Sequence, residues 1–137
     1  MTLEERAASY RRAFPKFPPV HVTDRWLYGV WTLGNDYRGT GYYGSYPPSF
    51  LRRVWSLFPD VDGRVLHLCS GSLPRGTRGV RLDYWTALEP DVAGDAHALP
   101  FVGAAFQVVI VDPPYGGDHA ARYHLPMVNR RRVVREA

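Results

Sequence analysis

The sequence contains a single cysteine, Cys69, among its 137 residues. A lone cysteine excludes an internal disulfide bond and any cysteine-rich zinc or iron–sulfur site, so the fold has to form without covalent cross-links. Nor is there an apolar run near the roughly 20 residues needed to span a bilayer, and residues 1–13 are charged and lack the hydrophobic centre of a signal peptide. We therefore expect a cytoplasmic protein without a membrane segment.

Internal repeats and low-complexity linkers are also absent, while 45% of the residues are hydrophobic. At this length such a composition supports about one domain with a real core. The formal net charge is +4, and the positive excess is concentrated near the end, in Arg130, Arg131, Arg132 and Arg135. This cluster is compatible with a phosphate-bearing partner such as DNA or RNA, although a solvated helix face is the commoner cause.

Residues 25–48 are crowded with aromatic side chains interleaved with glycines, which predicts loops and short extended pieces. We expect residues 1–46 to form an aromatic-rich N-terminal extension and residues 47–137 to form the main domain. The aromatic rings could stack on nucleic-acid bases. The favoured alternative is that they pack as a lid over the sheet.

The main domain has the pattern of an α/β protein. Residues 47–58 place apolar side chains at helical spacing after two prolines, which predicts an amphipathic helix. Four short apolar segments predict strands, and the last of them is apolar throughout, as in a parallel sheet covered on both faces. The connections run to about ten residues and leave room for single helical turns at most. The predicted strands are residues 64–69, 79–83, 91–94 and 106–111, and residues 125–137 predict a final helix.

An acidic residue, two prolines and an aromatic residue follow the fourth predicted strand directly: Asp112, Pro113, Pro114 and Tyr115. The prolines fix the backbone and remove amide donors, which leaves a stiff loop with free carbonyl acceptors. The Asp112 carboxylate and the Pro113 carbonyl could hold both hydrogens of an amino group on a planar ring while Tyr115 stacks on that ring. Both oxygens would also stabilise positive charge developing on the nitrogen. The alternative is an ordinary turn after a strand.

Together with its neighbours, this loop resembles the class I, Rossmann-like S-adenosylmethionine-dependent methyltransferases that act on the amino groups of adenine, cytosine, guanine or glutamine. That family shows a helix, a first strand with a glycine-rich loop, acidic residues after the second and third strands, and an Asp/Asn-Pro-Pro-Tyr loop after the fourth. The matching segments here follow the same order: Tyr46-Pro47-Pro48, residues 65–72, Asp83, residues 94–101 and residues 112–115.

The resemblance implies a Rossmann-like parallel sheet with strand order 3-2-1-4 that binds S-adenosyl-L-methionine at the carboxyl ends of its strands. The loop of Ser70, Gly71 and Ser72 would approach the methionine part of this donor, because glycine lets backbone amides come close to a ligand. Asp83 would accept hydrogen bonds from the ribose hydroxyls. Asp95 would accept from the adenine amino group, with Ala96 nearby.

Two further positions belong to the expected donor-binding set, Tyr46 and His67. His67 stands where the family usually carries an acidic residue, and Leu73 and Pro74 stand where a further glycine is usual. The family's sheet normally continues with three more strands, so the resemblance also implies a domain truncated after its fourth strand. An apolar edge strand at residues 106–111 would then favour self-association.

Two rival functions stay open beside methyl transfer to an amino nitrogen of a nucleic-acid base. One is a non-catalytic remnant that binds a nucleotide, a nucleic acid or a protein. The other is a small-molecule methyltransferase, which residues 94–101 also resemble. The histidines His97, His119 and His124 with Asp118 match no metal-site spacing, and we expect no metal site.

Overall fold

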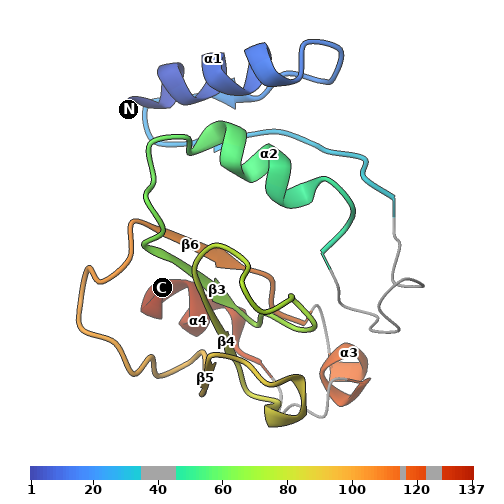
Figure 1. Ribbon diagram of the computed structural model, residues 1–137, viewed down its shortest axis with the longest axis vertical. Helices are drawn as coiled ribbons and strands as arrows, with labels where there is room; N and C mark the ends of the chain where they lie inside the picture. Colours follow the sequence, from blue (N-terminus) through green and yellow to red (C-terminus); the bar gives the residue numbers. More distant parts are fainter. Residues whose placement is uncertain (35–45, 115–116, 123–127) are drawn as a thin grey trace. The chain divides into compact units, whose positions relative to one another are not determined.

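The computed structural model describes residues 1–34, 46–114, 117–122 and 128–137 (Figure 1). The chain divides into two compact units, Met1–Asp60 and Val61–Ala137. In the described part of the chain, no helix is long and apolar enough to cross a membrane. The helix expected within residues 47–58 belongs to the first unit, whereas the sequence grouped it with the main domain.

The first unit begins with helix α1, Leu3–Ala13. Its start is a capping box: Thr2 Oγ1 accepts from the Glu5 N–H at 3.2 Å, and the Thr2 N–H donates to Glu5 Oε2 at 2.7 Å. Arg11 and Arg12 lie in the last turn, where positive charge complements the helix dipole. The hydrophobic pattern alone did not indicate this helix, but the Thr2-x-x-Glu5 pattern is its sequence signal.

A two-stranded antiparallel ribbon follows, formed by β1 (His21–Val22) and β2 (Leu27–Tyr28). One side of the ribbon faces the core of the unit, and the other side is open to water. Trp26 and Tyr28 are 71% and 57% exposed, so these two rings do not serve as packing for the unit. The core consists of Ala7, Tyr10, Val20 and Leu57, with Phe14, Val22, Leu27, Trp31 and Phe58 packed against it.

Helix α2, Phe50–Leu57, packs against α1 and carries a buried arginine. Arg53 is only 3% exposed, and its Nη1 donates to Tyr10 Oη at 3.2 Å. Its guanidinium carbon lies 4.2 Å from the centre of the Phe17 ring, with Phe14 and Trp31 also within reach of a cation–π contact. Among the described residues no carboxylate pairs with Arg53, so aromatic faces replace the usual counter-charge.

Four parallel strands form the sheet of the second unit: β3 (Val65–Leu68), β4 (Val80–Asp83), β5 (Val92–Ala93) and β6 (Val108–Val111). Their order across the sheet is β5-β4-β3-β6, and every neighbouring pair is parallel. In this register Leu68 lies opposite Leu82 on one side and Val111 on the other. The predicted α/β class with a parallel sheet is confirmed.

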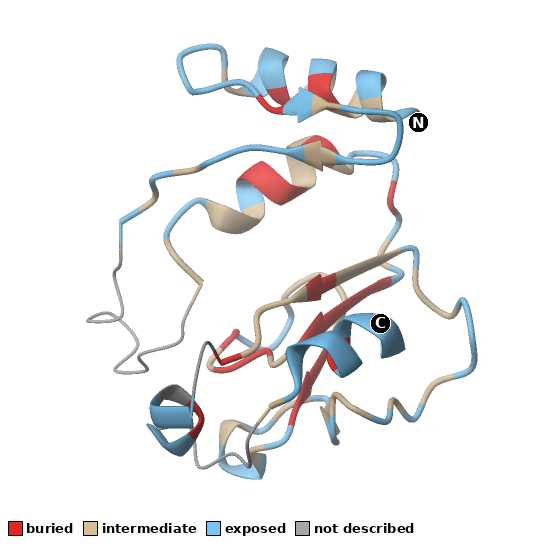
Figure 2. Cartoon of the chain, turned by 180° about the vertical axis from the view of Figure 1, so that it is seen from behind, coloured by how far each residue is buried: buried red, intermediate tan, exposed pale blue. Residues whose placement is uncertain are grey.

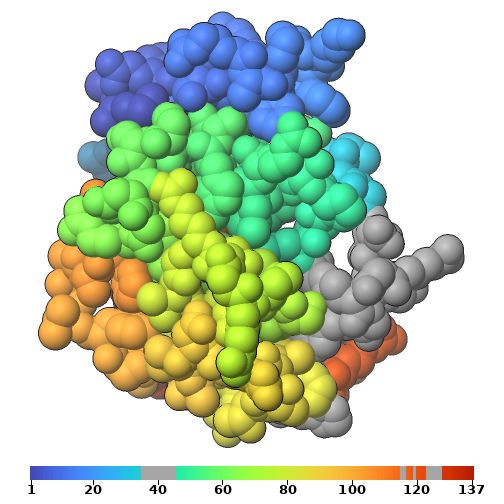
Figure 3. All heavy atoms as spheres, in the orientation of Figure 1, coloured from blue at the N-terminus to red at the C-terminus, as the bar shows by residue number. Residues whose placement is uncertain are grey.

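The connections between these strands contain almost no helix, because they are too short for a full crossover helix. Only turns and bends lie between β3 and β4, a single 3₁₀ turn η2 (Thr86–Leu88) lies between β4 and β5, and loop residues 94–107 lead to β6. Short connections keep the loops that follow β3 and β4 close together on the surface (Figure 3). Arg75 and Glu89 form an ion pair between them at 3.1 Å.

Strand β3 is the buried centre of the second unit (Figure 2). The C-terminal helix α4, Arg130–Glu136, covers the sheet through Val133, which is fully buried against Leu66, Leu68 and Leu82. The predicted final helix thus starts at Arg130, after the N-cap Asn129, and residues 125–127 lie outside the described part. A short helix, α3 (Gly117–Arg122), follows β6.

The prediction that the fourth strand is covered on both faces was wrong. In β6 only Ile110 is buried, at 8% exposure, and the other three residues are half-buried. The reason is its position: β6 is the last strand in the sheet order and pairs with β3 alone among the described residues. Among the described residues β6 is thus an edge strand, which is the position that the truncated domain of the sequence analysis would leave to residues 106–111.

A buried arginine also supports the second unit, but with conventional partners. Arg81 is 2% exposed, and its Nε and Nη2 donate to the two oxygens of Asp91 at 3.1 Å and 2.9 Å. Nη1 donates to the Leu73 carbonyl and Nη2 also donates to the Glu89 carbonyl. The Arg81 contacts hold the pKa of Asp91 below its usual value. The Arg81 guanidinium therefore connects the loop after β3 and the loop after β4 to Asp91, which directly precedes β5.

The chain passes from the loop into β4 at Gly79, which has φ +107°; a Cβ added there would lie 2.7 Å from the Val65 carbonyl oxygen. Gly63 has a similar φ of +113°, with nothing within 4 Å of the added atom. We predict that Gly79→Ala lowers the free energy of unfolding by about 1 to 3 kcal/mol more than Gly63→Ala, because overpacking adds to backbone strain. Urea denaturation of both variants measures this, and equal losses would contradict it.

Candidate functional site

The carboxyl ends of the four parallel strands meet at one edge of the sheet, and the predicted acidic residues lie there. Backbone bonds extend the sheet past the strand ends: Ser70 N–H donates to the Leu82 carbonyl at 3.1 Å, Gly94 N–H to the Asp83 carbonyl at 3.0 Å, and Asp112 N–H to the Leu68 carbonyl at 3.4 Å. These bonds set the loops that follow β3, β5 and β6 beside one another. The edge is the candidate site.

Asp83 ties two of these loops together. The residue is 4% exposed; Oδ2 accepts from the Gly71 N–H at 2.8 Å and Oδ1 accepts from the Trp85 N–H at 3.0 Å. A carboxylate can accept about four hydrogen bonds, so Asp83 retains capacity for a ligand. In this fold Asp83 also fixes the backbone of the loop of residues 70–72 through the bond from Gly71. The sequence did not reveal this structural role.

The loop after β3 makes a sharp left-handed turn. Cys69 has φ +56° and Gly71 has φ +55°, and for a residue with a side chain such a conformation is strained. Ser70 is 6% exposed, and its buried hydroxyl has no hydrogen-bond partner among the described residues. Buried polar atoms are nearly always satisfied, so this hydroxyl is an exception, although Ser70 does not line the pocket described below.

The loop after β5 orders the second predicted acid. Asp95 Oδ1 accepts from the His97 N–H at 2.8 Å and contacts His97 Nδ1 at 2.6 Å. The bond from the His97 backbone is the main cause that lowers the pKa of Asp95. The Asp95 side chain is still 52% exposed. It is therefore an ionised carboxylate, held in place but open to a ligand.

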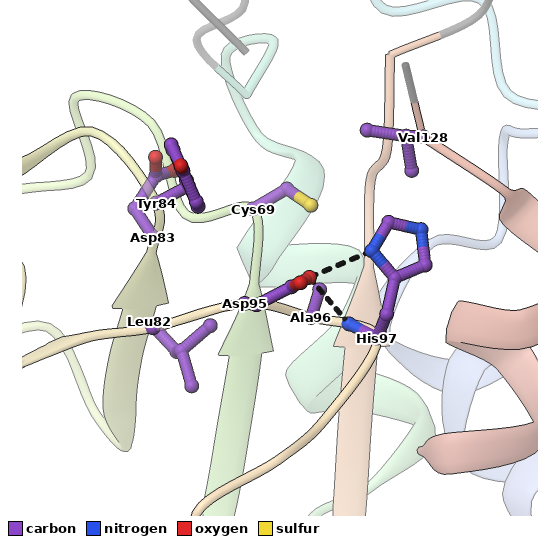
Figure 4. A pocket seen from close by; sticks show the side chains of 9 residues that line it. Cys69, Leu82, Asp83, Tyr84, Asp95, Ala96, His97 and Val128 are labelled. Atoms are coloured by element: carbon purple, nitrogen blue, oxygen red, sulfur yellow. Dashed lines mark hydrogen bonds and ion pairs between the residues drawn. The ribbon is translucent and has the colours of Figure 1, made fainter. Parts of the chain in front are cut away.

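A pocket lies between these loops (Figure 4). Asp95 and His97 point into the same space as the sulfur of Cys69, and Val128 lies across from them (Figure 4). Its volume is about 30 Å³, room for about two water molecules, so it can seat one end of a ligand that continues over the open edge of the sheet. The lining residues are Cys69, Leu82, Asp83, Tyr84, Gly94, Asp95, Ala96, His97 and Val128.

Cys69 lies beside predicted acids and lines the pocket together with Asp83 and Asp95. Burial raises the pKa of the Cys69 thiol to about 12, and the negative charges of Asp83, Asp112 and Asp95 add to the rise. The strand order and the backbone bonds between the strand ends place the carboxylates after β4, β5 and β6 at one edge of the sheet, beside the end of β3. The structure thus brings together the acidic residues that the sequence assigned to donor and acceptor.

Other predicted site residues lie elsewhere or are only partly described. His67 is fully buried and its Nε2 bonds to the Arg78 carbonyl at 2.9 Å; burial lowers its pKa. It does not belong to the pocket lining, and neither do Ser70, Gly71 and Ser72, of which Ser72 is half-buried. The ring of Tyr46 packs on Phe50 in the first unit, with centroids 4.9 Å apart. Their roles toward a donor stay predictions.

The Asp-Pro-Pro-Tyr loop is described as far as Pro114. Asp112 and Pro113 are half-buried, Pro114 is buried, and Tyr115 lies outside the described residues. The side chain of His119 and all of His124 are also outside it. Within the described part, no group of three or more His, Cys, Asp or Glu residues could hold a metal ion.

Sequence reasoning missed Cys69, Tyr84, His97 and Val128 as pocket residues. Tyr84 directly follows Asp83 and is 52% exposed, so its position after a strand end was a usable signal. No sequence signal marked Val128, because its position in the pocket wall depends on how α4 packs on the sheet. Comparison with protein-family models, curated proteins and solved structures gave no match to this chain.

We predict that Cys69 is unreactive in the folded protein. With a thiol pKa of about 12, little thiolate exists near pH 8, and the thiolate is the nucleophile. Alkylation by iodoacetamide at pH 8 should be about a hundredfold or more slower than in the same protein unfolded in urea. Mass spectrometry follows the reaction. Similar rates in both states would show that the thiol is not buried as its raised pKa requires.

Proposed function

We propose that this protein is an S-adenosylmethionine-dependent methyltransferase with a Rossmann-like sheet that acts on an amino nitrogen. The observation that supports the proposal is that Asp83, Asp95 and Asp112 follow β4, β5 and β6 at the carboxyl edge of one parallel sheet, where Asp83 and Asp95 line a common pocket. In the order β5-β4-β3-β6, the acids follow the strands in the places that the resembled methyltransferases use. Open parallel sheets place ligands at this edge.

The residues at the edge fit the polar groups of the donor. Asp95 offers an exposed carboxylate beside the apolar side chains of Ala96 and Val128, which suits a purine ring with an amino group. Asp83 has lone pairs left for ribose hydroxyls, and the buried Ser70 hydroxyl lacks a partner among the described residues. Tyr84 adds an exposed ring at the pocket wall. When bound, the donor supplies an electrophilic methyl group.

The loop after β6 would bind the methyl acceptor. The Asp112 carboxylate and the Pro113 carbonyl would accept both hydrogens of the amino group and orient its lone pair. The same two oxygens would stabilise the positive charge that develops on the nitrogen, and Asp112 could take the proton released afterwards. Tyr115 would stack on the ring that carries the amino group.

A nucleic-acid base is the acceptor that we propose, because the exposed Arg130, Arg131 and Arg135 on α4 offer positive charge to a phosphate backbone. We further propose that the edge of β6 pairs with a second chain. That strand has one partner among the described residues, and an open apolar edge favours such pairing. Neither proposal is needed for donor binding.

We predict that S-adenosylmethionine binds and that Asp95→Ala weakens the binding by about 1 to 3 kcal/mol, the cost of leaving a polar ligand group unpaired. Asp62→Ala is the matched control, because its carboxylate is 73% exposed and is absent from the pocket lining. Isothermal titration calorimetry measures both. No heat and no thermal shift at millimolar donor with the unmodified protein would remove the basis of the proposal.

We also predict that Asp112→Ala abolishes methyl transfer and leaves donor affinity nearly unchanged, because Asp112 is assigned to the acceptor. Transfer of a labelled methyl group to separate DNA, RNA and small-molecule pools measures the activity. Labelling of the small-molecule pool alone would replace the nucleic-acid acceptor with a small one. Donor binding without labelling of any pool would favour the non-catalytic alternative.

A further inference from the structure

His97 joins the loop after β5 to helix α4. It belongs neither to the predicted donor-binding residues nor to the loop that would hold the acceptor. Its side chain is 14% exposed. One ring nitrogen, Nδ1, lies 2.6 Å from Asp95 Oδ1, and the other, Nε2, lies 2.9 Å from the backbone nitrogen of Asn129. The ring therefore bridges a predicted donor-binding carboxylate and the N-cap of α4.

These two contacts fix the protonation of the imidazole. The backbone N–H of Asn129 can only donate, so Nε2 must present its lone pair. The Asp95 carboxylate can only accept, so Nδ1 must carry the proton. The arrangement requires a neutral His97 in the Nδ1–H form, since a proton on Nε2 would set two donors against each other.

Further hydrogen bonds connect α4 directly to the loop after β5. Arg132 Nε donates to the His97 carbonyl at 3.2 Å, and the Leu99 N–H donates to Glu136 Oε1 at 3.0 Å. Asn129 Oδ1 caps the helix by accepting from the Arg132 N–H at 3.1 Å. The loop and helix are thus linked at both ends of α4, and His97 takes part in two of the links.

The same contacts form part of the pocket. Asp95, His97 and Val128 all line it, and Val128 directly precedes Asn129. In Figure 4 the His97 ring lies between the Asp95 carboxylate and Val128. The position of one pocket wall therefore depends on the bond that His97 makes with the chain entering α4.

We propose that His97 is a positioning residue of the donor pocket, which holds the Asp95 carboxylate in one orientation and fixes Val128 by binding the backbone of Asn129. This inference rests on the proposed function, because S-adenosylmethionine is the ligand for which the pocket is positioned. The two contacts act together: one presents the polar acceptor and the other places the apolar wall against which the ligand packs.

Two substitutions separate the contacts. In His97→Asn the amide nitrogen takes the place of Nδ1 and still donates to Asp95, but no acceptor reaches Asn129. In His97→Gln the amide oxygen takes the place of Nε2 and still accepts from Asn129, but the bridge to Asp95 is lost. His97→Ala removes both contacts, and His21→Ala, in the first unit, is the matched control.

The test combines three measurements on the full chain. Nitrogen-15 NMR of the histidine side chains should show His97 as the Nδ1–H tautomer. Hydrogen exchange of the Asn129 amide should be about tenfold faster in His97→Asn and His97→Ala than in the unmodified protein, and nearly unchanged in His97→Gln. Calorimetry with S-adenosylmethionine should show an affinity about two- to tenfold lower in the Asn and Gln variants, lower still in the Ala variant, and unchanged in the control.

An Nε2–H tautomer, or equal Asn129 exchange in all three variants, would overturn the proposal. So would unchanged donor affinity in the three variants together with a loss of affinity in Asp95→Ala, and in that case the proposed function would stand. If the unmodified protein binds no donor, the proposed function fails and with it the pocket role of His97. The tautomer and the exchange data would then still decide whether His97 holds α4 to the loop.

Discussion

The buried carboxylate of Asp83 is the interaction on which the geometry of the candidate site depends. It accepts one backbone N–H from Gly71, after β3, and one from Trp85, after β4. Burying a charge is costly unless hydrogen bonds compensate it, and charge-assisted bonds to amides are among the strong ones. Asp83 therefore holds the two loops together beside the pocket, next to the left-handed turn at Cys69.

Each unit contains a buried arginine, and the groups that surround the guanidinium differ between the two units. In the second unit, Arg81 donates to the Asp91 carboxylate and to two carbonyls, so charge and hydrogen bonds are matched. In the first unit, Arg53 lies among aromatic rings with one bond to Tyr10 Oη. Each arginine connects segments that helices and strands alone leave apart, which suits a chain whose strands are short and whose crossovers carry almost no helix.

Local patterns predicted the strands well. Short apolar runs located all four strands, and the positions of Asp83, Asp95 and Asp112 after such strands place them at one edge, because parallel strands end at the same edge. What failed depended on contacts distant in sequence. The exposure of β6 follows from its place in the sheet order, and Val128 reaches the pocket only because α4 packs through Val133. The bond between His97 and Asn129 spans 32 positions, and no local pattern encodes it.

The most direct test of the account is NMR mapping of the site with S-adenosylhomocysteine, the demethylated form of the donor, on the isotopically labelled chain. We predict that the backbone amides of Gly71, Tyr84, Ala96 and His97 shift on titration, while amides of the β1–β2 ribbon do not. These amides lie in three segments far apart in the sequence that meet only at the carboxyl edge of the sheet. Saturable shifts confined to that edge would support donor binding there; absent shifts, or shifts centred on other residues, would contradict it.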